Sequence, residues 1–303
     1  MNDNSISQDF KSGFVAIVGA PNVGKSTLLN NVLGQKISII SSKSQTTRNR
    51  ILGIYHQPQY QIVFIDTPGV HITEKKLNVR MVDAAFSALK EVDIILLMID
   101  ASRPDSESEK LLLEKLKKRK KPVVLALNKV DLIKKTAMLP VIEKWSLSYD
   151  FNEIIPISAL QNFQMDILLK ALEDNLPPGP PYYPDDSITD LTEKFIAAEM
   201  IREKIFQFTS HEIPYSTVVT IESFKENKSK NNPITSINAS IHVERDSQKG
   251  IIIGKNGTTL KRIGIKARED IEKMTGVKVF LKLFVRLQKN WTKDTRALRR
   301  FGY

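Results

Sequence analysis

The feature that most constrains this chain is a glycine-rich turn from Gly19 to Ser26, which follows the apolar residues 15–18 and precedes an apolar helical pattern. Its letters, GAPNVGKS, match the P-loop pattern GxxxxGK followed by Ser or Thr. Glycine lets backbone N–H groups point into one concavity at the start of a helix, which favours an anion. We expect Lys25 to bind phosphate oxygens and the Ser26 hydroxyl to ligate Mg²⁺. A glycine turn that matches by chance is the alternative.

Length and composition indicate a globular protein of about two domains. The 303 residues are 41% apolar and 26% charged, and none is cysteine, which excludes disulfides and fits a reducing, cytoplasmic setting. The first 13 residues lack the apolar core of a signal peptide, and the longest apolar run, Ile94–Ile99, is far too short to span a bilayer. We therefore expect a soluble protein.

The net charge of +11 is concentrated toward the C-terminus. Residues 185–303 contain 22 basic and 15 acidic residues, and the stretch from Lys278 onward has eight basic residues against Asp294 alone. Such a bias predicts a polyanionic partner, either nucleic acid or an anionic membrane. A merely solvated basic tail is the alternative.

Strand-like runs alternate with helical patterns after the P-loop. The expected strands cover residues 51–55, 60–65, 92–99 and 122–127, and the expected helices cover residues 77–90 and 107–121. This alternation predicts a doubly wound α/β sheet, in which ligand loops follow the C-terminal ends of the strands.

The strand at 60–65 ends in Asp66-Thr67-Pro68-Gly69. A carboxylate at this place beside a P-loop would organise Mg²⁺, and the Gly69 N–H would contact a γ-phosphate. Hydrolysis would remove that contact and release the segment.

The strand at 122–127 is followed by Asn128-Lys129-Val130-Asp131, which predicts guanine recognition. The Asp131 carboxylate would accept from both N1–H and the N2 amine of guanine, whereas adenine would leave it unpaired. Asn128 would tie loops together, and the Lys129 stem would cover the base. After the next strand along the chain, the Ala159 N–H would donate a hydrogen bond to guanine O6.

Taken in order with Thr46-Thr47 and Ser158-Ala159-Leu160, these motifs resemble the translation-factor-type small GTPases. The resemblance implies that the chain binds GTP and GDP with Mg²⁺ and hydrolyses GTP. It implies Thr47, rather than Thr46, as the switch threonine, with an ordinary loop threonine as the alternative. The implied catalytic residues are Lys25, Thr47 and Gly69, and the implied Mg²⁺ ligands are Ser26, Thr47 and Asp66. The implied nucleotide-binding residues are Asn22, Val23, Gly24, Lys25, Ser26, Thr27, Asp66, Thr67, Pro68, Gly69, Asn128, Lys129, Asp131, Ser158 and Ala159.

Position 70 departs from the GTPases that orient the attacking water with a glutamine. The Val70 side chain neither donates nor accepts a hydrogen bond, so hydrolysis needs another arrangement. The resemblance is to a subgroup in which the residue at Asn22 helps hold a K⁺ in place of an arginine finger. A loop-stabilising role for Asn22 is the alternative, and we expect slow hydrolysis that a partner or K⁺ stimulates.

A proline-rich segment at 176–184 marks a domain boundary. Beyond it lies Gly254-Lys255-Asn256-Gly257, after three isoleucines and before an amphipathic helix. The flanking patterns are a helix at 191–208 and strands at 216–224, 235–243 and 277–287. This order resembles a type II KH domain, αββααβ.

The KH resemblance implies that the two glycines let an RNA backbone approach, that Lys255 neutralises phosphate, and that an adjacent apolar groove takes single-stranded bases. A structural corner between two helices is the alternative. Trp291 and Phe301 would either stack on bases or pack the last helix. Arg268 adds to the basic surroundings. The expected RNA-binding residues are Lys249, Gly254, Lys255, Asn256, Gly257, Lys261, Arg262 and Lys266.

Over nearly its full length the chain resembles the bacterial ribosome-assembly GTPases that carry a C-terminal KH domain. The expected parts are a flexible N-terminus (1–12), a P-loop GTPase domain (13–176), a proline-rich linker (177–190) and an α+β KH domain with a basic C-terminal segment (191–303). The resemblance implies binding near the 3′ end of small-subunit ribosomal RNA, maturation of that subunit, and a monomer away from the ribosome. It also implies a cytoplasmic location with peripheral association at the inner membrane. The alternative is a membrane-associated regulatory GTPase linked to the cell cycle.

Overall fold

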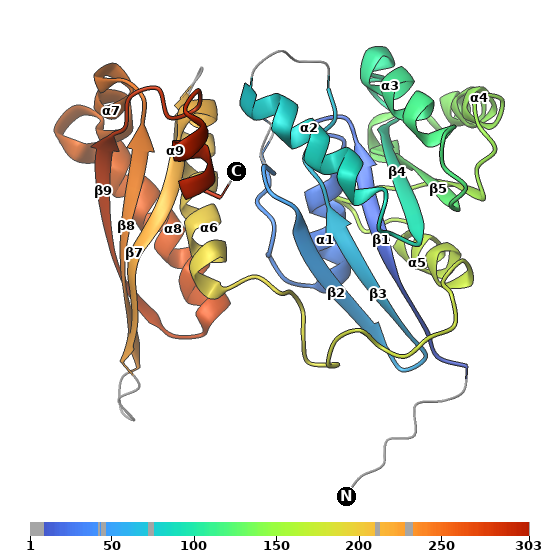
Figure 1. Cartoon of the computed structure of the whole chain (residues 1–303), viewed down its shortest axis with the longest axis horizontal. Helices are drawn as coiled ribbons and strands as arrows, with labels where there is room; N and C mark the ends of the chain where they lie inside the picture. Colours follow the sequence, from blue (N-terminus) through green and yellow to red (C-terminus); the bar gives the residue numbers. More distant parts are fainter. Residues whose placement is uncertain are drawn as a thin grey trace, which may run out of the picture. The chain divides into compact units, whose positions relative to one another are not determined.

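The computed structural model describes residues 9–41, 43, 47–71, 76–209, 213–227 and 233–302. It divides the chain into two compact units (Figure 1). Residues 1–38 and 47–190 form the first unit, and residues 39–46 and 191–303 form the second. The expected flexible N-terminus and Thr46 fall largely or wholly outside the described residues.

The first unit is built on a six-stranded sheet of order β2-β3-β1-β4-β5-β6. The strand β2 is antiparallel to β3, and the other neighbours are parallel. The prediction of a doubly wound α/β fold is therefore confirmed. The elements are β1 (Lys11–Gly19), α1 (Lys25–Leu33), β2 (Ile51–Gln57), β3 (Tyr60–Asp66), α2 (Lys76–Ala88), β4 (Ile94–Asp100), α3 (Ser106–Leu116), β5 (Val123–Asn128), α4 (Lys135–Ser146), β6 (Glu153–Pro156) and α5 (Met165–Asp174).

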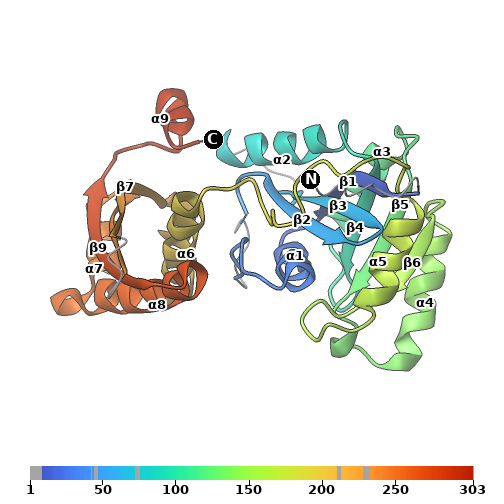
Figure 2. The ribbon, with the colours of Figure 1, turned by 90° about the horizontal axis from the view of Figure 1, so that it is seen from below.

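Helices cover both faces of this sheet. One apolar cluster joins α2, α3 and α4 to the central strands, while α1 and α5 lie on the opposite side from α2 and α3 (Figure 2). Because both faces are covered, β4 and β5 are buried along their whole length and read as continuous apolar runs. The parallel strands end at one edge, which brings the loops after β1, β3, β4, β5 and β6 together.

The helix expected at 107–121 ends earlier, at Leu116. Residues 117–121 are five consecutive cations, whose mutual repulsion opposes helix formation, and Pro122 disfavours the helical conformation of the residue before it. The basic run therefore lies beyond the helix rather than on its face.

Residues 177–190, expected as a connector, pack onto the first unit. The Ser12 N–H donates to Pro177 O at 3.1 Å, and the Gly179 N–H donates to Phe10 O at 2.9 Å. Further on, the Ile54 N–H donates to Ile188 O at 2.7 Å. The segment thus leaves the sheet only near residue 190, where the first unit ends.

The second unit has a three-stranded sheet of order β7-β8-β9, with β7 antiparallel and β9 parallel to β8. An apolar cluster from all three strands packs on α6, α7 and α8. The predicted αββααβ order is confirmed. The elements are α6 (Glu193–Phe208), β7 (Val218–Asn227), β8 (Ile234–Val243), α7 (Asp246–Ile253), α8 (Thr258–Thr275), β9 (Lys278–Leu287) and α9 (Thr295–Arg300).

The C-terminal aromatic residues belong to the packing of this unit. Trp291 is fully buried, and its Nε1–H donates to Ser216 O at 2.9 Å. Phe301 lies against Trp291 and His242, with ring centroids 5.4 and 5.0 Å apart. Of the two roles that the sequence left open, packing is the one these contacts support.

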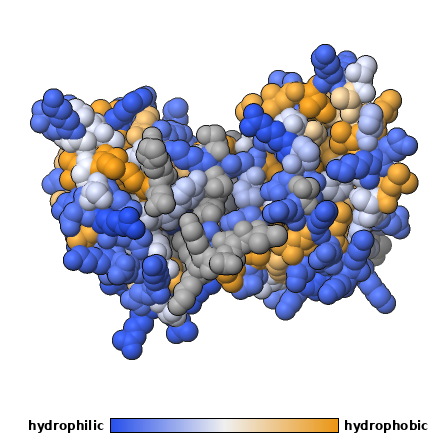
Figure 3. Space-filling view, turned by 90° about the horizontal axis from the view of Figure 1, so that it is seen from above, coloured by the Kyte–Doolittle hydropathy of each residue, from blue (hydrophilic) through white to orange (hydrophobic). Residues whose placement is uncertain are grey.

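Hydrophilic side chains dominate the face drawn in Figure 3, with smaller hydrophobic patches between them. Within the described residues, every helix is too short or too polar to cross a membrane.

Candidate functional site

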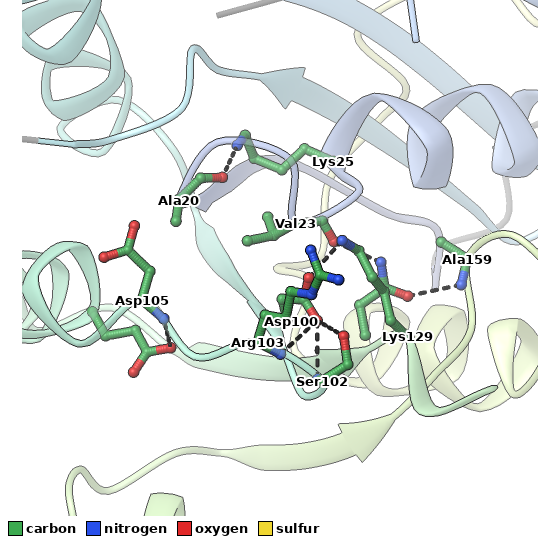
Figure 4. Close-up of polar contacts among 11 residues, drawn as sticks. Ala20, Val23, Lys25, Asp100, Ser102, Arg103, Asp105, Lys129 and Ala159 are labelled. Carbon is green, nitrogen blue, oxygen red and sulfur yellow. Dashed lines mark hydrogen bonds and ion pairs between the residues drawn. The ribbon is translucent and has the colours of Figure 1, made fainter. Parts of the chain in front are cut away.

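The P-loop connects β1 to α1, and its geometry requires glycine at position 24. Gly24 has φ 106°, a left-handed conformation, and a Cβ there would come within 2.3 Å of Asn128 Nδ2. The buried Lys25 ammonium donates to Gly19 O at 3.1 Å and to Ala20 O at 2.9 Å (Figure 4). Burial lowers the pKa of Lys25 to about 8, although the nearby Asp66 opposes this shift. An anionic phosphate at this point would therefore be strongly favoured.

Asp66, at the end of β3, is fully buried among hydroxyl groups. Its Oδ2 accepts from Ser26 at 2.8 Å and from Ser38 at 3.0 Å, and the Ser26 and Thr47 hydroxyl oxygens lie 2.9 Å apart. Burial raises the pKa of Asp66, against the opposing effects of Lys25 and the hydroxyls. Its Oδ1 has no hydrogen-bond partner among the described residues. An orphaned carboxylate oxygen beside two hydroxyls is a set of hard oxygen donors that fits Mg²⁺.

The segment after Asp66 is held against the P-loop. The Thr67 hydroxyl donates to Ile17 O at 2.8 Å, and the Val70 N–H donates to Gly19 O at 3.0 Å. A Cβ on Gly69 would come within 2.7 Å of Pro21 Cα, so this position also tolerates no side chain. Val70 is fully buried, and its side chain packs in the apolar core.

Asn128 joins three loops, as the sequence predicts. It is buried at the end of β5, and its Nδ2 donates to Val23 O at 2.7 Å. Its Oδ1 accepts from the Ala159 N–H at 2.9 Å. The donor predicted for guanine O6 is thus already engaged by Asn128. Asp131 follows in a short 3₁₀ turn, Val130–Leu132, and is exposed.

Lys129 has a partner that sequence reasoning missed. Its ammonium lies 2.5 Å from Asp100 Oδ2, at the end of β4 (Figure 4). Burial favours a higher pKa for Asp100, but hydrogen bonds from Lys129 and Ser102 outweigh it and the pKa is lowered. Asp100 could have been found from the sequence, because it is a carboxylate at the end of a buried strand, as Asp66 is.

The remaining predicted nucleotide residues lie along the same edge. Asn22 is exposed with φ 62°, and Ser158 is buried with its hydroxyl accepting from the Gln161 N–H at 3.2 Å. Thr27 is half-buried in α1, and Pro68 is buried. Ser38 was not predicted, because only its bond to Asp66 reveals it.

The glycine turn of the second unit lies between α7 and α8. Gly254 has φ 73°, and a Cβ there would come within 2.3 Å of Thr259 Oγ1, so glycine is required. Lys255 and Asn256 are exposed in this turn. An open groove of about 390 Å³ begins at Gly257 and runs between α8 and β9. It is lined by Gly257, Leu260, Lys261, Gly264, Ile265, Arg268, Leu281 and Leu283.

The structure brings only some of the predicted RNA-binding residues to this groove. Lys261 lines it, and so does Arg268, which the predicted set omits. Arg262 instead lies over the Phe208 ring of α6 at 4.2 Å, and Lys266 pairs with Glu269 at 2.8 Å. The division follows helix periodicity, because residues 261, 264, 265 and 268 share one face of α8. Lys249 is half-buried on α7.

Family comparisons agree with both units. A family model described as a 50S ribosome-binding GTPase matches residues 14–129, and one described as a KH domain matches residues 212–292. The fold and the loops at its edge define a P-loop GTPase with a C-terminal KH domain, and the chain is a GTP-hydrolysing enzyme.

Curated relatives and solved structures match almost the whole chain. GTPase Era of Geotalea uraniireducens is 53% identical over 296 residues, which are 98% of this chain and 99% of that protein. GTPase Era of Geobacter metallireducens is 52% identical over the full length of both. A variant of Aquifex aeolicus Era bound to GDP·AlF4⁻ has TM-score 0.92 and 42% identity, and covers 97% of this chain and 99% of its own. Era in complex with MgGDPNP and nucleotides 1506–1542 of 16S ribosomal RNA gives the same TM-score and coverage with 43% identity. The chain belongs to the Era family of GTPases.

Proposed function

We propose that this GTPase is a nucleotide-controlled switch that binds small-subunit ribosomal RNA near its 3′ end and acts in assembly of that subunit. The observation that carries the proposal is the open groove beside the Gly254–Gly257 turn, with Lys261 and Arg268 on its wall. An apolar floor with basic walls suits unstacked bases and their phosphates. The Era structure with nucleotides 1506–1542 of 16S ribosomal RNA supports the same partner.

We infer that residues 13–176 are the GTPase domain, 177–190 the linker and 191–303 the KH domain. The packing of 177–190 on β1 and β2 supports a linker that is anchored to the GTPase side. The chain would work as a monomer away from the ribosome.

The nucleotide site would hold GTP with its phosphates at Gly24, Lys25, Ser26 and Thr27. Ser26, Thr47 and Asp66 would ligate Mg²⁺, which neutralises charge on the phosphate oxygens when it is bound. When GTP binds, the Lys25 ammonium would exchange its hydrogen bonds to the Gly19 and Ala20 carbonyls for bonds to the phosphates. Burial makes the charged ammonium costly, so an anionic partner is favoured. The Gly69 N–H would donate to the γ-phosphate and Asp131 would accept from the guanine edge.

Water for hydrolysis would be placed by the ordered loops, since the buried Val70 faces the core. We infer that K⁺ binds near Asn22 and adds positive charge beside the phosphates. Hydrolysis measured in KCl and in NaCl at equal ionic strength tests this: a faster rate in KCl that Asn22→Ala abolishes is expected, and equal rates contradict it.

Coupling between nucleotide and RNA would pass through residues 39–46. Their neighbours on either side, Ser38 and Thr47, contact Asp66 and Ser26 in the nucleotide site. The segment itself belongs to the second unit, where the Ile40 N–H donates to Glu203 of α6 at 3.3 Å. Lys43 donates to the carbonyls of Phe206, in α6, and of Thr209, which follows that helix. A change at Thr47 on GTP binding would therefore pull on a segment bonded to α6.

Binding of a fragment with the 3′-terminal sequence of small-subunit ribosomal RNA tests the function. We expect tighter binding than for a shuffled fragment of equal length at the same salt concentration. Binding should weaken in the Lys255→Asp, Asn256→Asp variant, because two carboxylates at this exposed turn would repel the RNA backbone. Equal affinity for both fragments would contradict the proposal.

We infer a cytoplasmic location, with peripheral membrane association as a further expectation. The alternative of a membrane-surface regulator draws no support from the relatives. Flotation with anionic vesicles separates the two readings: binding at physiological salt with no preference for RNA would favour the membrane.

A further inference from the structure

The open face of the second unit's sheet carries a row of side chains that neither the nucleotide site nor the groove uses. Side chains alternate along β9, so that Leu281 and Leu283 line the groove while Phe280, Lys282 and Phe284 point to the other face. Phe280 and Phe284 are 50% and 48% exposed. We call the outward-facing residues Lys278, Phe280, Lys282, Phe284 and Arg286 the β9 row.

This row alternates cations with aromatic rings. The Lys282 ammonium lies 5.3 Å from the centroid of the Phe280 ring. Glu222 of β7, on the same face, is paired with Arg286 at 3.5 Å. Beside the row, β8 presents Ser236 opposite Phe280 and Asn238 opposite Lys282 in register, which gives the face a polar floor.

Helix α9 covers only one end of the face. Its neighbour Phe301 contacts His242, which pairs in register with Arg286 at the end of the row. In Figure 1 this face of the sheet is turned to the viewer, and α9 lies in front of its upper part only. Arg296, Arg299 and Arg300 of α9 are exposed and extend the positive charge around that end.

We propose that the β9 row is a second binding surface for single-stranded RNA, on which Phe280 and Phe284 each stack on a base and Lys282 meets a phosphate between them. The inference rests on the proposed function of the groove and extends its footprint. Aromatic side chains on an open sheet face are a recurrent platform for single-stranded bases, and neighbouring cations track the backbone.

The spacing suits two separate bases. Four residues along a strand span about 13 Å, which leaves room for a phosphate at Lys282 between the two rings. Continuity with the groove gives the same strand of RNA access to both surfaces. Because β9 is an outer strand of the sheet, an RNA leaving the groove at Leu281 and Leu283 crosses one strand edge to reach Phe280 and Phe284.

Charge distinguishes RNA from an apolar protein partner here. Each ring of the row is flanked by cations, and Glu222 is paired with one of them, Arg286, so the surface suits a ligand that is itself polyanionic and has flat apolar faces. Single-stranded RNA has both properties.

The test compares two RNAs in the full chain bound to a GTP analogue at fixed salt. The short one, of about four nucleotides, fills the groove alone, and the long one extends the same sequence in both directions. The double variant Phe280→Leu, Phe284→Leu keeps apolar area but loses the rings. We expect it to bind the long RNA at least tenfold more weakly than the unaltered chain does, and the short RNA equally well.

The matched control is Phe280→Tyr, Phe284→Tyr, which keeps both rings and should bind the long RNA normally. Lys255→Asp, Asn256→Asp tests the groove separately and should weaken both RNAs. Unchanged binding of the long RNA by the Leu variant overturns the second surface, and so does equal weakening of both RNAs. A groove variant that binds the short RNA normally would instead refute the groove.

A direct readout uses Phe280→Trp as a reporter. Trp145 and Trp291, the chain's two tryptophans, are both buried, so a tryptophan at 280 would be the exposed one. Stacking predicts quenching of its fluorescence by the long RNA and little change with the short RNA. Equal quenching by both would contradict stacking at this position.

Discussion

In the first unit, segments far apart in the sequence meet through buried polar groups. The Asn128 side chain hydrogen-bonds to both Val23 and Ala159. The Asp66 carboxylate accepts hydrogen bonds from the Ser26 and Ser38 hydroxyls. In the second unit, the groove is formed by α8 and β9, which are neighbours in the sequence, and Lys261 on its wall is exposed.

This difference predicts different costs of substitution. Removing one member of a buried network leaves its partners unsatisfied, so each loss is large and base selectivity is sharp. An exposed basic groove gains affinity from charge and apolar contact spread over many residues, so each loss is smaller and depends on salt.

The largest effect is expected for Lys25→Ala. Loss of charge-assisted bonds to two phosphate groups should weaken GTP binding by about a thousandfold, roughly 4 kcal/mol. Titration with a fluorescent GTP analogue measures it, with the exposed Lys118→Ala as a control of equal charge change. A normal GTP affinity in the Lys25 variant would refute the phosphate site.

Asp131→Asn should exchange the base preference. An amide can donate to the O2 of xanthine but cannot accept both guanine donors, so GTP affinity should fall by about a hundredfold while XTP affinity rises. Competition between GTP and XTP measures the ratio. If the ratio stays as in the unaltered chain, Asp131 does not read the base.

Lys255→Asp, Asn256→Asp should leave GTP binding unchanged and weaken RNA binding by about tenfold or more at physiological salt. The slope of log affinity against log salt should fall by about one for each lost phosphate contact. A variant with normal RNA affinity at every salt concentration would mean that the turn does not touch the RNA backbone.

The smallest expected effect is a dependence on pH of the free energy of unfolding of the second unit. Burial, together with Arg286 and Arg300, lowers the pKa of His242, against a weaker opposite effect of Glu222. The unfolded chain therefore binds more protons than the folded one as pH falls through about 6.5. The free energy of unfolding of this unit should thus decrease as pH falls from about 7.5 to about 5.

Denaturation of a Trp145→Phe chain measures this stability, because Trp291 is then its single tryptophan and reports on the second unit. His242→Gln should flatten the dependence. If the free energy of unfolding falls with pH as steeply in that variant as in the parent, groups other than His242 cause the pH dependence.

Sequence motifs predict where the candidate nucleotide-binding residues lie, because these residues hold fixed places at strand ends. Asn128 is the last residue of β5 and Asp66 the last residue of β3, so their positions follow from where these strands end. It is harder to predict which way a helical side chain points, since the sequence alone does not show which basic residues of α8 face the groove. Packing against Phe208 takes Arg262 away from the groove, and helix phase puts Arg268 into it. The anchored linker was missed because its partners, Phe10 and Ile54, are distant in the sequence.

We propose that the bound nucleotide controls the affinity of the second unit for RNA. The direct measurement is the affinity for the 3′-end RNA fragment with a non-hydrolysable GTP analogue and then with GDP, at one salt concentration, in the unaltered chain and in Lys43→Ala. We predict at least about tenfold tighter binding with the analogue, a difference of about 1.4 kcal/mol, and a smaller ratio in the variant. Equal affinity in the two nucleotide states would contradict control of RNA binding by the nucleotide.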